Sequence, residues 1–81
     1  MKKPIENAEY SEIEDLLIRS IKEIDNKIQL KYEQDFSDLD LYIKHSEYGI
    51  AYELLIYILD KEVYKWPSSL EKAGAKMNLY P

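Results

Sequence analysis

The chain has 81 residues, enough for one small domain, and its content of 46% hydrophobic and 33% charged residues is typical of globular proteins. It contains no cysteine, and its formal net charge is −5. These values exclude a disulfide framework and a thiolate zinc site. They also argue against direct nucleic-acid binding, which needs clustered Lys and Arg side chains.

The negative charge lies in the first half of the chain. Residues 1–40 carry eleven acidic and six basic side chains, whereas residues 41–81 carry five of each. No apolar run approaches the ~20 residues of a membrane span. The two lysines near the N-terminus are followed by no apolar segment, unlike those of a secretion signal. We therefore expect a single cytoplasmic domain over residues 1–81, with no membrane partner.

A long amphipathic helix is predicted over residues 11–30. Its apolar side chains recur every three or four residues, at Ile13, Leu16, Leu17, Ile21, Ile24 and Ile28. Ser11 followed by Glu14 is the pattern of a capping box, and Pro4 offers an alternative start. Residues 31–37 interrupt the apolar pattern, so we expect them to form a connection.

A short helix is expected next, capped by Ser37 or Asp38 and ending near His45. Ser46 is a candidate cap for a second long helix. The apolar positions of that helix are Ala51, Leu54, Leu55, Ile58, Leu59 and, at its end, Val63. The pair Trp66-Pro67 should stop it, because a residue before proline is disfavoured in the helical region.

Ser68 and Glu71 repeat the capping-box spacing and predict a last short helix through Leu70, Ala73 and Met77. The chain has only two glycines and three prolines, which favours a few long elements over many short strands. The sequence therefore predicts an all-α fold, a small bundle of about four helices, two long and two short.

Residues able to carry catalysis are almost absent. His45 is the only histidine, and we expect it to be a surface or capping residue. Gly49 and Gly74 stand alone, so no glycine-rich phosphate loop exists, and the carboxylates lack the spacing of a calcium loop. We therefore expect a protein that is not an enzyme and that has no metal or cofactor.

An acidic segment around Phe36 is the first feature above this background. It holds four acidic residues in eight positions, Glu33 to Asp40. One interpretation is a solvated loop followed by helix-capping acids. The other is a docking surface for a basic protein, because exposed carboxylates speed association with such a partner. The candidate partner-binding residues are Tyr32, Glu33, Asp35, Phe36, Asp38 and Asp40.

Tyrosine is the second such feature, with eight Tyr against one Phe and one Trp. Its ring suits half-buried positions and interfaces alike. Tyr48, Tyr52 and Tyr57 lie on the second long helix, whose apolar stripe is already supplied by aliphatic side chains. We therefore expect at least one of these three rings to be exposed.

Residues 45–55, His-Ser-Glu-Tyr-Gly-Ile-Ala-Tyr-Glu-Leu-Leu, contain a string that resembles the Glu-Tyr-Gly-x-Ala-x-Glu-x-Leu signature of the MafI-like immunity proteins. These are small helical proteins encoded beside bacterial polymorphic and contact-dependent growth inhibition toxins. Residues 66–79 also look like that family's closing helix with its Met-x-Leu ending. We interpret the motif residues as mainly structural: Glu47, Tyr48, Gly49, Ala51, Glu53 and Leu54.

The resemblance implies a cytosolic inhibitor that binds and neutralises a cognate toxin, often a nuclease. Combined with the acidic segment, it favours a basic toxin such as a ribonuclease, bound by a monomer or a weak homo-oligomer. Two alternatives stay open. One is a helical adaptor or regulatory module that binds a protein other than a toxin, and the other is a structural homo-oligomer.

Overall fold

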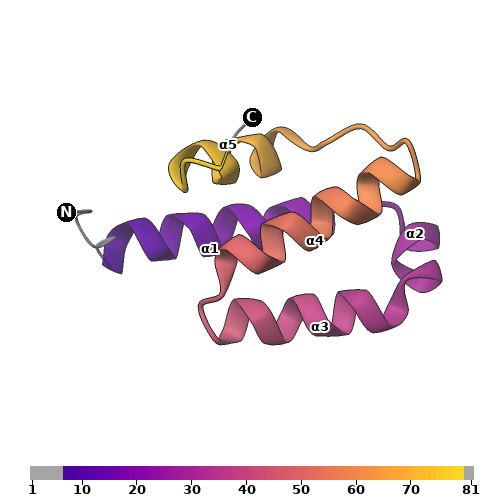
Figure 1. Ribbon diagram of the computed structural model, residues 1–81, viewed down its shortest axis with the longest axis horizontal. Helices are drawn as coiled ribbons and strands as arrows, with labels where there is room; N and C mark the ends of the chain where they lie inside the picture. Colours follow the sequence, from indigo (N-terminus) through magenta and orange to yellow (C-terminus); the bar gives the residue numbers. More distant parts are fainter. Residues whose placement is uncertain (1–6, 80–81) are drawn as a thin grey trace.

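The computed structural model describes residues 7–79, and within this range the chain is a bundle of five α-helices without strands (Figure 1). The helices are α1 Asn7–Lys22, α2 Asn26–Lys31, α3 Glu33–Lys44, α4 Tyr48–Lys61 and α5 Ser68–Lys76. The predicted all-α class is confirmed, with one helix more than expected. No helix in the described range is both long and apolar enough to cross a membrane. Pro4 lies outside the described residues.

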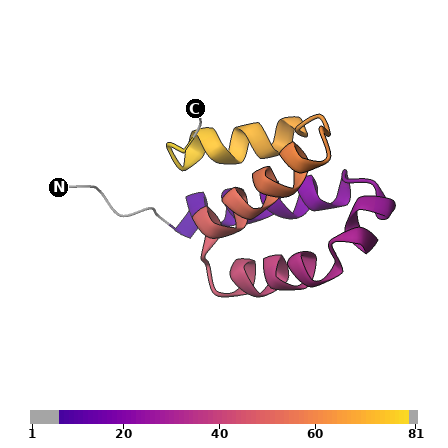
Figure 2. The ribbon, with the colours of Figure 1, turned by 45° about the vertical axis from the view of Figure 1, so that its right-hand side comes forward.

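α4 occupies the centre of the bundle. It packs against α1, α3 and α5, with α3 and α5 on opposite sides of it and α1 behind it (Figures 1 and 2). α1 also packs along α5, while α2 joins α1 to α3 at one end. α3 contacts α2 and α4 and therefore forms one edge of the molecule.

The core is built from the apolar stripes that the sequence predicts. In the stripe that runs from α1 into α2, Leu16 and Ile21 are partly buried, and the other residues, including Ile24 between the two helices, are buried. In α4, Ala51, Leu55, Ile58 and Leu59 are fully buried, and Leu54 packs against them at the margin. The buried residues of the core are Ile13, Leu17, Ile24, Ile28, Leu39, Ile43, Tyr48, Ala51, Tyr52, Leu55, Ile58, Leu59, Leu70 and Ala73.

The single helix predicted over residues 11–30 is wrong, because the chain breaks between α1 and α2. The Asp25 carboxylate accepts a hydrogen bond from the Lys27 amide at 2.8 Å and so caps α2. The side-chain amide of Gln29 donates to the carbonyls of Ile21 and Ile24, at 3.0 and 2.9 Å, and so ties α2 to the end of α1 and the turn that follows it. The apolar pattern does not reveal the break, because the apolar sides of both helices face the same core.

The connection predicted over residues 31–37 is also wrong, and so is the late start of the helix that follows it. Tyr32 alone separates α2 from α3, which begins at Glu33. Phe36, Leu39 and Ile43 face the core at spacings of three and four. Carboxylates of Glu33 and Asp35 lie in the first turn of α3, where the helix dipole favours negative charge.

None of the predicted serine caps forms. Ser11 lies inside α1, and Ser68 is the first residue of α5, preceded by Pro67 at the N-cap position. Glu47, not Ser46, occupies the N-cap position of α4, and its side chain makes no capping hydrogen bond. Ser46 instead belongs to the end of α3.

Three helices end on a non-glycine residue in the left-handed region: Ser46, Val63 and Asn78, with φ of 59°, 51° and 58°. After α4 the amide of Tyr64 donates to the carbonyl of Leu59 at 2.9 Å, which is the Schellman pattern, and the same pattern closes α3 and α5. The expected burial of Val63 is wrong, since 91% of the residue is exposed. The helix stops at Lys61, before Trp66-Pro67 is reached.

Gly74 of α5 is the glycine on which the packing depends. A β-carbon there would lie 2.6 Å from Cζ of Tyr52 in α4, too close for any real contact. At Gly49 a β-carbon would lie 3.7 Å from the Leu79 side chain, an ordinary distance. The close approach of two helices thus occurs at Gly74, not at Gly49.

Candidate functional site

The four acidic residues predicted to bind a partner lie on two flanks of α3. Successive residues of a helix are rotated by about 100°, so Glu33 and Asp40 share one side and Asp35 and Asp38 share the other. Glu33 and Asp40 are exposed, while Asp35 and Asp38 are half-buried. The structure therefore brings the four carboxylates onto one helix but not onto one face.

The two aromatic residues of the predicted set take part in the packing. Tyr32 and Phe36 are both half-buried against the core. The Tyr32 hydroxyl donates to the Glu62 carboxylate at 2.8 Å, and the Lys31 ammonium reaches the same oxygen at 2.9 Å. Only the outer edges of these rings are left for a partner.

This Lys31–Tyr32–Glu62 cluster shifts the titration of its members. The hydrogen bonds from Lys31 and then Tyr32 lower the pKa of the Glu62 carboxyl below its ordinary value of 4.5. The same hydrogen bonds to Glu62 raise the pKa of the Lys31 ammonium and of the Tyr32 phenol. The cluster ties the α2–α3 joint to the end of α4.

The motif residues of α4 divide into buried and exposed positions. Tyr48 and Ala51 are buried in the core, and Leu54 lies at its margin. The Tyr48 ring packs at 5.8 Å from that of Tyr10, and its hydroxyl lies 3.4 Å from Glu14 of α1. Glu53 is exposed on the outer side of the helix.

The outer face of α4 carries apolar side chains that no other helix covers. Ile50 is 48% exposed and Tyr57 is 55% exposed, and Leu54 lies between them at helical spacing. The ammonium of Lys61 lies 5.2 Å from the centre of the Tyr57 ring. Of the three tyrosines on α4, Tyr57 is the exposed one, which confirms the prediction that at least one of these rings is exposed.

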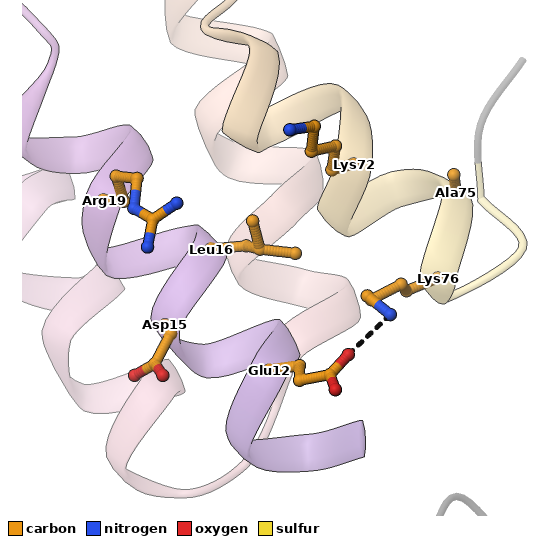
Figure 3. A pocket seen from close by; sticks show the side chains of 7 residues that line it. All are labelled: Glu12, Asp15, Leu16, Arg19, Lys72, Ala75 and Lys76. Carbon is orange, nitrogen blue, oxygen red and sulfur yellow. Dashed lines mark ion pairs between the residues drawn. The ribbon is translucent and has the colours of Figure 1, made fainter. Parts of the chain in front are cut away.

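A groove of about 440 Å³ runs between α1 and α5 and is open to solvent (Figure 3). Its apolar part is formed by Leu16 and Ala75. Five charged side chains surround this part: Glu12, Asp15, Arg19, Lys72 and Lys76. Lys76 and Glu12 form an ion pair of 2.6 Å that bridges the two helices at one end of the groove.

A buried chain of hydrogen bonds joins the same two helices. The Ser20 hydroxyl has two acceptors within hydrogen-bond distance, the Leu16 carbonyl at 2.7 Å and Oγ of Ser69 at 3.0 Å. The Ser69 hydroxyl donates to the Glu23 carboxylate at 2.8 Å. Ser20 lies in register with the apolar stripe of α1, a signal that could have identified it as buried.

A second hollow, of about 500 Å³, lies beside the connection between α4 and α5. It is lined by Tyr64, Trp66 and the carboxylate-bearing residues Glu23 and Glu71, among others. The Trp66 indole donates to Asp60 at 3.1 Å and the Tyr64 hydroxyl to the Glu23 carbonyl at 3.3 Å. These polar groups are therefore engaged in holding the connection in place.

Within residues 7–79 no group of three or more His, Cys, Asp or Glu side chains could hold a metal ion. His45 is exposed at the C-cap of α3. A scan against protein-family models, a search of curated proteins and a search of solved structures each found no match. The fold and its surfaces define an all-α bundle with an acidic edge helix, an exposed apolar face and a groove.

Proposed function

We propose that the protein is a cytoplasmic immunity protein that binds and neutralises a cognate bacterial toxin, with a basic ribonuclease domain as the leading candidate. The observation that carries the proposal is the acidity of α3, which has four carboxylates against the single lysine Lys44 in 12 residues. Asp40 lies 3.9 Å from that lysine, a weak exposed pair. The resemblance of residues 45–55 to MafI-like immunity proteins supports the toxin as the partner.

Two modes of inhibition suit an edge helix of this kind. In the first, carboxylates of α3 enter the toxin's cleft and occupy the positions of RNA phosphates. In the second, they clamp a basic surface beside the cleft and exclude RNA sterically. α3 lies at one edge of the bundle, where it packs against α2 and α4, so its outer side is accessible to a toxin cleft as the first mode requires.

The test starts with co-purification of the chain with the protein encoded immediately upstream. Charge reversal then examines the flanks of α3 separately, with Asp35→Lys/Asp38→Lys for one flank and Glu33→Lys/Asp40→Lys for the other. We expect reversal of the contacting flank to slow association about tenfold or more and to flatten its salt dependence, because surface charges act mainly on encounter.

Glu53→Lys/Glu71→Lys is the matched control, since it makes the same change of net charge on α4 and α5. If both α3 double variants bind the toxin as the control does, the docking surface lies elsewhere. If no toxin is encoded upstream and none co-purifies, the immunity function itself is wrong.

The exposed apolar face of α4 favours the alternative of an adaptor or a homo-oligomer. Ile50, Leu54 and Tyr57 form the row of anchors by which a helix docks against another protein. Size-exclusion chromatography with light scattering separates these cases. A strict monomer would exclude the homo-oligomer and leave the exposed face of α4 available to a different partner.

A further inference from the structure

We propose that the groove between α1 and α5 binds a short segment of a partner protein in which an apolar side chain stands next to a carboxylate. The groove combines an apolar floor with two basic side chains that converge on it from different helices (Figure 3). It is separate from the acidic flanks of α3, and the inference holds whether or not the partner is a toxin.

The charges around the groove leave one end positive. Lys76 neutralises Glu12 through their ion pair, and the Asp15 carboxylate points away from α5. The side chains of Arg19 and Lys72 point toward each other above Leu16, and neither side chain makes an ion pair or hydrogen bond within residues 7–79. In a chain of net charge −5, two such cations form a local site for an anionic group, and the planar guanidinium suits a carboxylate.

The floor of the groove selects an apolar neighbour for that carboxylate. Leu16 is half-buried and Ala75 is exposed, so an incoming aliphatic side chain would cover both and leave the core unchanged. A volume of about 440 Å³ accommodates a few side chains. Because the groove is open, it encloses too little of a free small molecule, and a segment already held by a larger interface is the better occupant.

The walls of the groove are fixed before anything binds. The Ser20–Ser69–Glu23 hydrogen bonds hold α1 against α5, and the Lys76–Glu12 pair bridges the two helices at one end of the groove. Binding to a site that needs no rearrangement costs little free energy for ordering the protein. We therefore expect even the binding of a short peptide to be detectable.

The experiment is a titration of the isotope-labelled protein with acetyl-Leu-Asp-Leu-amide, followed in two-dimensional amide NMR spectra. Acetyl-Leu-Asn-Leu-amide is the matched neutral probe. We expect saturable shifts near Leu16 and Ala75 with a millimolar dissociation constant, and binding of the neutral peptide weaker by about fivefold or more.

Two variants with the same change of charge separate the groove from the rest of the surface. Arg19→Gln/Lys72→Gln should lower the affinity for the acidic peptide about fivefold or more. Lys27→Gln/Lys65→Gln should leave that affinity unchanged. Ala75→Glu places a carboxylate in the groove and should compete with the peptide. The amide spectrum of each variant reports its folding directly.

Equal binding of the two peptides would overturn the inference, as would unchanged binding to Arg19→Gln/Lys72→Gln or the absence of shifts around the groove. If a groove variant fails to fold, the unsubstituted protein still decides, because its affinity for the acidic peptide must fall with added salt. The toxin has no part in this measurement, so its outcome and that of the co-purification are independent.

Discussion

Val63 is a β-branched residue with φ of 51°, and 91% of it is exposed to solvent. The left-handed conformation costs an L-residue roughly 1–2 kcal/mol, and a branched β-carbon fits it least well. No burial compensates for this cost. The residue is held there because the Schellman hydrogen bonds of α4 require a left-handed residue at this position, and the chain supplies no glycine.

Replacement of Val63 by glycine should therefore stabilise the protein. We expect Val63→Gly to raise the free energy of unfolding by about 1 kcal/mol, after allowance for the greater freedom of glycine in the unfolded chain. The measurement is urea unfolding followed by circular dichroism.

Lys65→Gly is the control for this prediction. It adds the same freedom to the unfolded chain within the same connection, but it replaces a residue that is not left-handed. It should be neutral or slightly destabilising. A Val63→Gly protein no more stable than Lys65→Gly would show that Val63 carries no strain.

At the scale of an element, α2 is a helix of six residues that owes its position to its ends more than to its length. A helix this short is unstable alone. Ile28 anchors it in the core, Asp25 caps its start, and Gln29 bridges back to the last turn of α1. Together these contacts turn the chain from α1 toward α3.

Removal of the cap should loosen this turn. We expect Asp25→Ala to lower the free energy of unfolding by about 1 kcal/mol, because an Ncap oxygen satisfies an amide that is otherwise unpaired. Hydrogen exchange of the Lys27 amide should accelerate as well. Asp25→Asn, which keeps a side-chain oxygen, should retain most of the stability, and Asn26→Ala should be neutral. If Asp25→Ala behaves like Asn26→Ala, the cap is unimportant.

The elements show what periodicity can and cannot predict. It locates α4 and the buried side of α1 because spacings of three and four report which residues face the core. It does not reveal the break at Asp25, because α1 and α2 continue one stripe across it. The Asp25-Asn26 pair is a capping signal present in the sequence, whereas Ser11, Ser46 and Ser68 carry the same signal and cap nothing.

At the scale of the whole molecule, composition locates the acidic segment of residues 33–40 but not its helical structure. The sequence shows four carboxylates in residues 33–40, yet their division between two flanks follows from the start of α3 at Glu33, a residue predicted to lie in a connection. The groove between α1 and α5 was not predicted. Its cations Arg19 and Lys72 are brought together by the packing of α1 against α5. A local sequence pattern does not predict such tertiary packing.

The Lys31–Tyr32–Glu62 cluster joins residues about thirty positions apart and connects the α2–α3 joint to the end of α4. Glu62 has a lowered pKa in the folded protein, so the unfolded chain binds its proton more readily. The stability that Glu62 contributes is therefore complete above 4.5, its ordinary pKa, and is lost as pH falls through the lower folded pKa. Lys31 and Tyr32 have raised pKa values, so their contribution is lost in strongly alkaline solution.

Glu62→Gln should remove the dependence at acid pH while keeping an oxygen that can accept the two hydrogen bonds. Between neutral pH and about pH 3 the variant should lose less stability than the unsubstituted protein, because it has no carboxylate to protonate at this joint. Urea unfolding midpoints across this range provide the measurement. Glu53→Gln is the control, since Glu53 is exposed on the same helix and makes no ion pair or hydrogen bond within the described residues. Parallel acid profiles for the two variants would mean that the acid sensitivity of the fold originates elsewhere, whereas a flattened profile for Glu62→Gln alone would assign it to the contact that holds α2, α3 and α4 together.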